Sequence, residues 1–392
     1  MSKPVFVLSD HHENWINLNP LTLTKPVALL RVGITTIQEK WESFVGKKIK
    51  LKTCVPYLKD CDSWMPEQGV SFVFINSSIL PNQKLCDAIS LLTDGQSLYK
   101  QGELIASKIT LGQESLEEAI QYTEEVIQIK HLWDIFSKND AVLRQDFEQL
   151  TKGRQSDELS QSNTLIGPKN QLFIESGAKV EGAILNTSTG PIYIGKSAEV
   201  MEGALVRGAL ALCDNAVLKL GAKIYGATTI GPFSKVGGEV NNSVIQGYSN
   251  KGHDGFLGNS VIGEWCNLGA DTNNSNLKNN YGEIDIYSFK EKGYVNSNLQ
   301  FLGLIMGDHS KCGINTMFNT GTVIGVFANV FGSGFPPKYI PSFSWGGSEG
   351  FSTFKYDKAL EVAERVMSRR QIELTLKDKT ILKFIHETSE VQ

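Results

Sequence analysis

Cysteine patterns are the first thing that this sequence lacks. None of its six cysteines forms a C-x-x-C pair or follows a zinc-ligand or disulfide spacing: Cys54, Cys61, Cys86, Cys213, Cys266 and Cys312. We therefore expect reduced thiols that pack as small apolar side chains, and no metal site.

Excess positive charge and long apolar runs are also missing. The formal net charge is -4 and the isoelectric point is near 6.0, whereas nucleic-acid binders usually carry clustered Lys and Arg. No stretch approaches the roughly 18 apolar residues of a membrane span, and the first apolar run is too short for a signal peptide. We therefore expect a cytoplasmic protein that binds neither nucleic acid nor a membrane.

Glycine, in contrast, is abundant, and most of the 37 glycines follow position 160. In this region an aliphatic residue returns at every sixth position: Ile194, Val200, Val206, Leu212, Leu218, Ile224, Ile230 and Val236. Four positions after each of the first seven aliphatic residues stands another residue, which is small in most cases: Ala198, Ala204, Leu210, Ala216, Ala222, Thr228 and Ser234. This hexapeptide period predicts a parallel β-helix, in which three hexads make one triangular coil and the coils stack to bury their apolar faces.

The period is interrupted twice. Val236 and Ile262 are 26 positions apart, which is four hexads plus two, and this spacing predicts an inserted loop that contains His253. A second break, from about residue 273 to 302, is rich in Asn, Lys and Tyr and is also predicted to leave the prism. Loops that leave a solenoid usually carry its binding function, and the alternative is a tolerated surface insertion.

The segment around His253 carries a more specific signal. The chain reads Gly252-His253-Asp254-Gly255-Phe256-Leu257-Gly258, then Asn267-Leu268-Gly269-Ala270-Asp271-Thr272 and Asn276. These motifs resemble the acetyltransferase half of the bifunctional UDP-N-acetylglucosamine pyrophosphorylase/glucosamine-1-phosphate acetyltransferases, which are left-handed β-helix enzymes. The resemblance implies that His253 is the general base and that Asn267 and Asn276 orient the amino sugar. It also implies that Gly269 and Ala270 lie near the thioester of acetyl-CoA.

The residue types suit this chemistry. Only a neutral amine attacks a thioester, so an imidazole that removes the proton contributes roughly 10²- to 10⁴-fold, and backbone N–H groups of a glycine-rich segment can hold the oxyanion. Two residues depart from the family, because Phe256 replaces a tyrosine and Asp271 replaces a glycine, and the acyl acceptor therefore stays open. Lys251 and Lys278 are candidates for binding a sugar phosphate, and the alternative is that both are simply solvated.

Residues 1–155 show no hexapeptide period. Short apolar runs alternate with helical segments, which predicts an α/β domain. Ser115-x-x-Glu118 resembles a capping box and predicts a helix that runs through Ala119, Tyr122 and Val126.

Residues 18–41 resemble the signature of sugar-1-phosphate nucleotidyltransferases. This resemblance makes Lys25, Arg31 and Asp10 candidates for phosphate and metal contacts, and Asn76 stands where those enzymes place a Mg²⁺-binding aspartate. Mg²⁺ is thus the expected cofactor if this domain is active. The glycine-rich loop that wraps the triphosphate in those enzymes is missing, however, and a solvated role is the alternative for each residue.

Further segments make the resemblance extend along the chain. They include LWDIFSKN (132–139), GGEVNNSVI (237–245) and SGFPPKYIPSFSWGG (333–347), which are similar to a family of sugar nucleotidyltransferases described as alternative forms of the bifunctional enzyme. After residue 351 the glycines stop, and apolar residues recur at helical spacing: Ala359, Val362, Ala363 and Val366. This segment is predicted to cap the open end of the solenoid.

The sequence thus predicts an α/β nucleotidyltransferase-like domain (1–155), a left-handed parallel β-helix acyltransferase domain (156–350) and a helical C-terminal cap (351–392). The handedness, and a homotrimer with acceptor pockets at subunit boundaries, follow from the resemblance. The predicted function is acetyl-CoA-dependent N-acetylation of an amino-sugar phosphate such as glucosamine-1-phosphate. The first domain is expected to use UTP and form UDP-N-acetylglucosamine. The alternatives are a sugar-1-phosphate nucleotidyltransferase without acyltransferase activity, and a trimeric scaffold that binds a nucleotide sugar.

Overall fold

The computed structural model describes residues 4–112 and 117–389. Contacts divide the chain into two compact units. Unit 1 contains the described parts of Met1–Leu18, Thr24–Leu30 and Thr35–His131, and unit 2 those of Asn19–Leu23, Arg31–Ile34 and Leu132–Gln392. No helix in the described ranges is long and apolar enough to cross a membrane.

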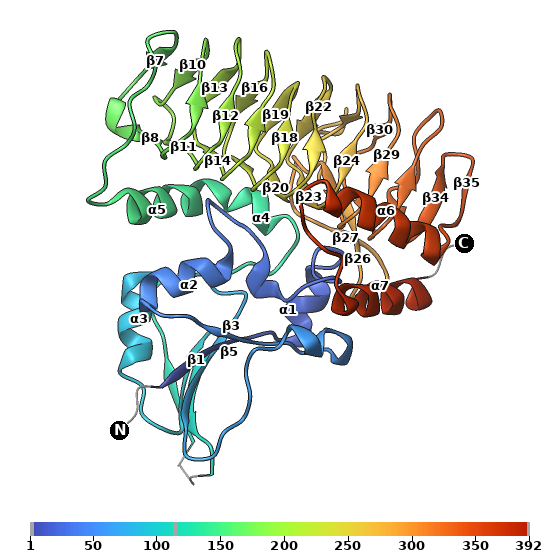
Figure 1. Cartoon of the computed structure of the whole chain (residues 1–392). Helices are drawn as coiled ribbons and strands as arrows, with labels where there is room; N and C mark the ends of the chain where they lie inside the picture. The colour runs from blue at the N-terminus through green and yellow to red at the C-terminus, as the bar shows by residue number, and fades with distance from the viewer. Residues whose placement is uncertain (1–3, 113–116, 390–392) are drawn as a thin grey trace. The chain divides into compact units, whose positions relative to one another are not determined.

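Unit 1 is built on a six-stranded mixed sheet with the order β2-β1-β3-β5-β4-β6 (Figure 1). Its strands are β1 (Val5–Ser9), β2 (Lys50–Lys52), β3 (Ser71–Asn76), β4 (Gln96–Lys100), β5 (Glu103–Thr110) and β6 (Glu118–Gln121). Its helical segments are α1 (His12–Asn17), η1 (Val27–Leu29), α2 (Ile37–Val45), η2 (Pro56–Cys61) and α3 (Gln83–Ser90). Because β1, β2 and β3 are parallel, their carboxyl ends Ser9, Lys52 and Asn76 meet at one edge of the sheet.

One predicted helix of unit 1 is wrong. The segment expected to be helical after Ser115 forms strand β6, which pairs in parallel with β4 and places Ala119 beside Ser97. Ser115 itself lies outside the described residues. Pairing with an open sheet edge overrides a weak local helix signal, because intrinsic propensities are small compared with the hydrogen bonds of a ladder.

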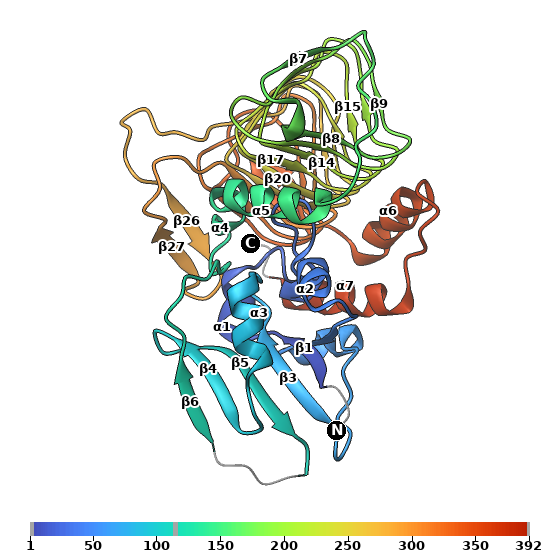
Figure 2. The ribbon, with the colours of Figure 1, turned by 90° about the vertical axis from the view of Figure 1, so that its left-hand side faces the viewer.

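Unit 2 is a β-solenoid with three parallel walls, whose coils overlie one another in Figure 2. The first wall contains β7 (Thr164–Ile166), β10 (Ile184–Asn186), β13 (Leu205–Arg207), β16 (Lys223–Tyr225), β19 (Glu239–Asn241) and β22 (Phe256–Gly258). The second wall contains β8 (Leu172–Ile174), β11 (Ile192–Ile194), β14 (Leu210–Leu212), β17 (Thr228–Ile230), β20 (Val244–Gly247), β23 (Val261–Glu264), β28 (Leu304–Met306), β31 (Thr322–Ile324) and β33 (Tyr339–Ile340). The third wall contains β9 (Lys179–Val180), β12 (Glu199–Val200), β15 (Val217–Leu218), β18 (Lys235–Val236), β21 (Asn250–Lys251), β24 (Asn267–Leu268), β29 (Lys311–Cys312), β32 (Asn329–Val330), β34 (Ser344–Gly347) and the antiparallel β35 (Gly350–Thr353).

The hexapeptide period sets these walls. All eight aliphatic residues of the period are at most 3% exposed and belong to one continuous core, and the seven residues that follow four positions after the first seven are fully buried. The structure therefore confirms an α/β domain, a β-solenoid of hexapeptide coils, and C-terminal helices.

The insertion predicted around His253 is wrong. A regular coil spans 18 positions, as in the pairing of Leu218 with Val236, but Val236 pairs with Lys251 only 15 positions later. The next coil pairs Asn250 with Asn267, 17 positions apart. Two coils are thus shortened, and His253 lies at a corner of the wall between β21 and β22.

The second predicted break does leave the wall. Ile262 pairs with Met306, 44 positions later. The extra residues contain β25 (Asn273–Asn274), which pairs with β30 (Met317–Phe318), and a hairpin of β26 (Asp285–Ser288) and β27 (Gly293–Asn296).

Helices accompany the solenoid along its sides. The helical segments of this unit are α4 (Asp134–Ser137), α5 (Asn139–Thr151), η3 (Lys169–Gln171), α6 (Tyr356–Ser368) and α7 (Leu376–Thr388). Leu143 and Phe147 of α5 pack on the second wall, in a cluster with Phe173 and Tyr193. The predicted C-terminal cap is wrong in its placement, because the helical tail runs back beside the coils, where Arg370 donates to the Phe233 carbonyl at 3.3 Å (Figure 1).

Candidate functional site

A hollow of about 460 Å³ opens at the corner where the third wall turns into the first wall. It is lined by the residues that follow four successive strands of the third wall: Lys219, Leu220, Gly237, Gly238, Gly252, His253, Asp254, Ala270 and Asp271. The imidazole of His253 is exposed at this corner. The structure therefore brings together two of the predicted site residues, His253 and Ala270.

The glycines around His253 allow the coils to approach closely. A Cβ atom on Gly238 would lie 2.8 Å from Asp254 Cα and 2.9 Å from the His253 carbonyl oxygen. Gly255 has a φ of 114°, and a Cβ there would lie 2.2 Å from the Thr272 carbonyl oxygen. These two positions need glycine because the corner that carries His253 packs directly against the backbone of the coils before and after it.

Lys251 lies beneath the hollow and not in solvent. Its side chain is 2% exposed, and its Nζ donates to the carbonyl oxygens of Gly237 at 3.0 Å and His253 at 2.9 Å. Burial lowers the pKa of this lysine to about 8, against the opposing effect of the Asp254 and Asp271 carboxylates. The predicted roles of Lys251, as a phosphate ligand or a solvated lysine, therefore do not fit its position.

Two carboxylates stand beside His253 in the hollow. The Asp271 backbone N–H donates to the Asp254 carbonyl at 3.0 Å, and Asp271 adopts a left-handed φ of 55°. Both side chains are exposed, and Lys219 adds one ammonium group to the same rim. The hollow can thus present an imidazole, two carboxylates and a cation to one small molecule.

The other predicted substrate residues lie elsewhere on the coils. Asn267 is exposed on β24, the strand that leads directly into the Gly269–Ala270 corner, but it does not line the hollow. Phe256 and Asn276 lie together beside Gly258, where a Cβ would meet Phe256 Cζ at 2.5 Å and Asn276 Nδ2 at 2.7 Å. Asn276 Nδ2 also donates to Asn259 Oδ1 at 2.8 Å. Neither Phe256 nor Asn276 lines the hollow that contains His253.

A ladder of aromatic rings along another corner was not anticipated from the sequence. Tyr248 stacks on Trp265 with ring centroids 4.2 Å apart, and His309 stacks on Phe327 at 4.5 Å. Each of these residues has a left-handed φ between 54° and 62°, once per coil. His309 is 7% exposed within this ladder, so it is a packing residue and does not line the hollow. His309 and Phe327 are 18 positions apart, one regular coil, and this spacing is the sequence signal for part of the ladder.

Unit 1 contains its own hollow of about 380 Å³ at the carboxyl ends of β1, β2 and β3. Ser9, Lys52 and Asn76 line it, together with His11 and Trp64. Lys52 Nζ lies 5.0 Å from the centroid of the Trp64 ring. Burial lowers the pKa of His11. Ligands of α/β proteins bind at such strand ends, so this is the candidate ligand position of unit 1.

The predicted phosphate residue Arg31 has a different role. It belongs to unit 2 and is 9% exposed, and its guanidinium donates to the carbonyl oxygens of Ile34 and Gln246. Lys25 is 8% exposed and does not line the hollow of unit 1. Asn76 does line this hollow, but its amide is bonded to Asn14 at 3.2 Å and to the Leu104 carbonyl at 3.2 Å.

The residues of unit 1 do not fit a Mg²⁺ site. Mg²⁺ prefers carboxylate ligands, and Asp10 is the carboxylate nearest to the end of β1 in sequence. One of its oxygens accepts from the Ser77 hydroxyl and the other from the Val27 N–H. Burial raises the pKa of Asp10 to about 6, although these two hydrogen bonds lower it. Within 4–112 and 117–389, no three His, Cys, Asp or Glu residues form a group that could hold a metal ion.

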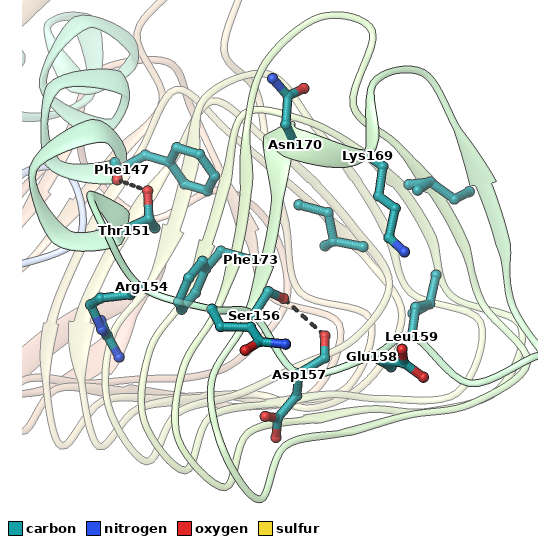
Figure 3. Close-up of a pocket in the computed structure, with 13 residues that line it drawn as sticks. Phe147, Thr151, Arg154, Ser156, Asp157, Glu158, Leu159, Lys169, Asn170 and Phe173 are labelled. Carbon is teal, nitrogen blue, oxygen red and sulfur yellow. Dashed lines mark hydrogen bonds between the residues drawn. The ribbon is translucent and has the colours of Figure 1, made fainter.

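A third hollow, of about 550 Å³, lies at the amino-terminal end of the solenoid (Figure 3). Arg154 lies 5.1 Å from the centroid of the Phe173 ring and pairs with Glu175 at 2.6 Å. Glu175 also accepts from the Tyr193 hydroxyl at 2.7 Å. None of the residues predicted from the sequence to form a site lines this hollow.

The comparisons with known proteins agree with the two-part organisation. Residues 6–155 match the family described as sugar nucleotidyl transferase. This nucleotidyl transferase match covers unit 1 and also α5, which belongs to unit 2 by its contacts.

One of the relatives combines both activities in its name. The chain is 28% identical over 252 residues to a bifunctional sugar-1-phosphate nucleotidylyltransferase/acetyltransferase of Sulfurisphaera tokodaii, covering 63% of this chain and 56% of that protein. It is 34% identical over 87 residues to the bifunctional protein GlmU of Methanocaldococcus jannaschii, covering 22% of this chain and 21% of that protein. An Arabidopsis UDP-N-acetylglucosamine acyltransferase structure aligns with 54% of this chain and 77% of its own at 15% identity, with a TM-score of 0.24. The family match and the Sulfurisphaera relative confirm the resemblance inferred from the sequence, and the chain spans 56% of that relative.

Proposed function

We propose that unit 2 is an acetyl-CoA-dependent N-acetyltransferase that acts on an amino-sugar phosphate of the glucosamine-1-phosphate type. The observation that carries this proposal is the exposed imidazole of His253 in a hollow that also contains the Ala270 corner. The similarity to bifunctional nucleotidylyltransferase/acetyltransferases supports the reaction class.

In the proposed reaction, His253 is the general base. The neutral amine of the acceptor attacks the thioester carbonyl, and the imidazole takes the amine proton as the C–N bond forms. The tetrahedral intermediate then collapses with loss of the CoA thiolate, which receives the proton from the imidazolium. The backbone N–H of Ala270 would stabilise the oxyanion, since the Gly269 N–H already donates to the Cys312 carbonyl at 3.1 Å. The reaction needs no metal and no covalent enzyme intermediate.

The charges of the hollow suit such an acceptor. Asp254 and Asp271 attract the ammonium form of the amine and draw it to the rim. Lys219 offers a cation to the phosphate. Because all three groups are at least partly exposed to water, they contribute to orientation more than to affinity.

A homotrimer would complete the site. Phe256 and Asn276 lie beside Gly258, away from the His253 hollow, so they can contribute only if a second copy brings them there. Large apolar side chains stand exposed on the first wall and at its corner with the third wall, including Leu205 at 47%, Leu220 at 66% and Ile314 at 71%. Exposed apolar surface of this kind is typical of an interaction surface.

The experiment is His253→Ala in an assay of CoA release with glucosamine-1-phosphate as acceptor. The loss of a general base is expected to lower kcat by roughly 10²- to 10⁴-fold. The elution volume in size-exclusion chromatography is expected to stay unchanged, which would show that the assembly is intact. His12→Ala is the matched control, because His12 is another exposed histidine and lines none of the three hollows. Full activity of the His253 variant would eliminate the assignment.

A second candidate function, nucleotidyl transfer in residues 6–155, is favoured by the family match and by the hollow at the strand ends. Against it stand the missing glycine-rich loop and the hydrogen-bonded oxygens of Asp10. Pyrophosphate release from UTP and N-acetylglucosamine-1-phosphate, measured with added Mg²⁺, tests it. Ligand binding without release of pyrophosphate would indicate that unit 1 only binds the nucleotide sugar.

A further inference from the structure

Lys251 occupies a position that the solenoid otherwise gives to apolar side chains. It pairs with Val236 in the third wall. The inward residues of the neighbouring coils in this wall are Val200, Leu218, Val236, Leu268 and Cys312, all members of the hydrophobic core. At 2% exposure, Lys251 is therefore an ionisable side chain inside the prism.

Packing and stability do not explain this lysine. A buried ammonium loses its hydration, which is why burial lowers the pKa of Lys251 to about 8. The folded state binds this proton less tightly than the unfolded chain, whose lysine has a pKa of 10.5. The free energy of unfolding therefore rises as the pH increases from about 8 towards 10.5, and the charged lysine is a destabilising element at pH 7. An unbranched apolar side chain would fill the same space without this cost.

What Lys251 does contribute is a link between two coils under the hollow. Its Nζ joins the carbonyl oxygen of Gly237, on one coil, to that of His253, on the next. Gly237, Gly252 and His253 all line the hollow. The bond at the His253 carbonyl restrains the backbone from which the imidazole projects.

We propose that Lys251 is a positioning residue, which fixes the His253 corner against the Gly237 corner so that the imidazole faces the acceptor amine. This inference rests on the proposed function and concerns the same site. It gives the lysine a role through His253, without contact to substrate. A misplacement of about 1 Å in a catalytic group can lower a rate about 10²-fold, so the effect is expected in kcat.

The test is Lys251→Met, which keeps the length of the side chain and removes both hydrogen bonds. We expect a kcat lowered about 10- to 100-fold and a KM within about threefold of the original protein. We also expect a changed chemical shift of the His253 ring in protein labelled with ¹³C-histidine, assigned by its loss in His253→Ala.

Lys311→Met is the matched control. Lys311 is a partly buried lysine next to the inward Cys312, burial lowers its pKa, and its Nζ donates to the His309 carbonyl at 2.9 Å. It does not line the hollow, and its variant is expected to leave kcat and the His253 ring signal unchanged.

The outcomes separate this inference from the proposed function. An unchanged His253 signal and an unchanged kcat in Lys251→Met would overturn the positioning role, even if His253→Ala is inactive. A Lys251→Met protein that does not fold would also overturn it, because the lysine would then be structural. A shifted ring signal together with a fully active His253→Ala protein would support the geometry and reject the proposed reaction.

Discussion

Gln246 gives a direct measure of how the segment Arg31–Ile34 is held in unit 2. The Arg31 N–H donates to Gln246 Oε1 at 2.6 Å, and Gln246 Nε2 donates back to the Arg31 carbonyl at 3.0 Å. Gln246 is 4% exposed and Arg31 is 9% exposed, so water does not easily replace these bonds. Leucine at position 246 has a similar size and no polar atom.

The magnitude follows from the two main-chain groups that lose a bond. Each buried donor or acceptor that is deprived of its partner costs about 1–3 kcal/mol. The bond from Arg31 Nε to the main-chain carbonyl of residue 246, at 3.3 Å, does not depend on the side chain and remains. We therefore expect Gln246→Leu to lower the free energy of unfolding by about 2–6 kcal/mol.

Urea unfolding followed by far-ultraviolet circular dichroism measures this loss. Gln300→Leu is the matched control, because Gln300 is exposed and its amide donates to the Tyr281 carbonyl at 2.8 Å on the surface. The control is expected to change the free energy by less than about 0.5 kcal/mol. A loss below about 1 kcal/mol in Gln246→Leu would refute the reasoning, since it would mean that water satisfies the Arg31 main chain.

Two further predictions concern burial. The pKa of Asp10 is about 6 in the folded chain, against an ordinary value of 3.8 for an aspartate in the unfolded chain. The folded chain therefore binds this proton more tightly, and the free energy of unfolding falls as the pH rises from 3.8 through 6. The loss amounts to about 3 kcal/mol. Asp10→Asn should thus have a higher free energy of unfolding than the original protein at pH 8 and the same value below pH 4. Urea titrations at both pH values check this. An equal gain in free energy at both pH values would contradict it. Phe327 is 1% exposed and stacks on Phe343 with centroids 5.3 Å apart, so Phe327→Ala should cost about 3–5 kcal/mol in the same assay. Phe335→Ala, at a side chain that is 52% exposed, should cost less than about 0.5 kcal/mol, and similar losses in both would show that the ladder is not stabilising.

The walls of the solenoid could be predicted from the sequence because their signal is local. A residue such as Leu212 faces inward for the same reason as Leu218 six positions later, and each is fully buried. The insertion before Met306 could also be anticipated, because its extra residues have no place in a coil, but the hairpin of β26 and β27 within it was not predicted.

The coils around His253 could not be read in the same way. The 26 positions between Val236 and Ile262 can be read as four hexads with two residues added, or as five hexads with four residues removed. The structure has the second arrangement, with coils of 15 and 17 positions. Lys251 interrupts the hexapeptide pattern further, because a search for apolar residues at inward positions does not accept a lysine. Spacing alone does not distinguish a longer loop from a shorter coil.

The role of Arg31 was out of reach for a different reason. Its neighbours along the chain resemble a phosphate-binding signature, but its hydrogen-bond partner Gln246 is 215 residues away. Nothing near Arg31 in the sequence reports that distant amide. Similarly, the strand β6 replaced an expected helix because its partner β4 offers a free edge.

The membership of α5 and Arg31–Ile34 in unit 2 has a practical consequence for dividing the gene. Asn139 and Asp146 of α5 accept hydrogen bonds from the N–H groups of Gly33 and Ile34, and the same helix covers Phe173 and Tyr193. A fragment that starts at residue 156 would expose this apolar patch and is expected to aggregate on expression. A fragment that starts at residue 132 keeps α5 but lacks Arg31–Ile34, which α5 binds. No single truncation therefore yields a complete unit 2 without unit 1.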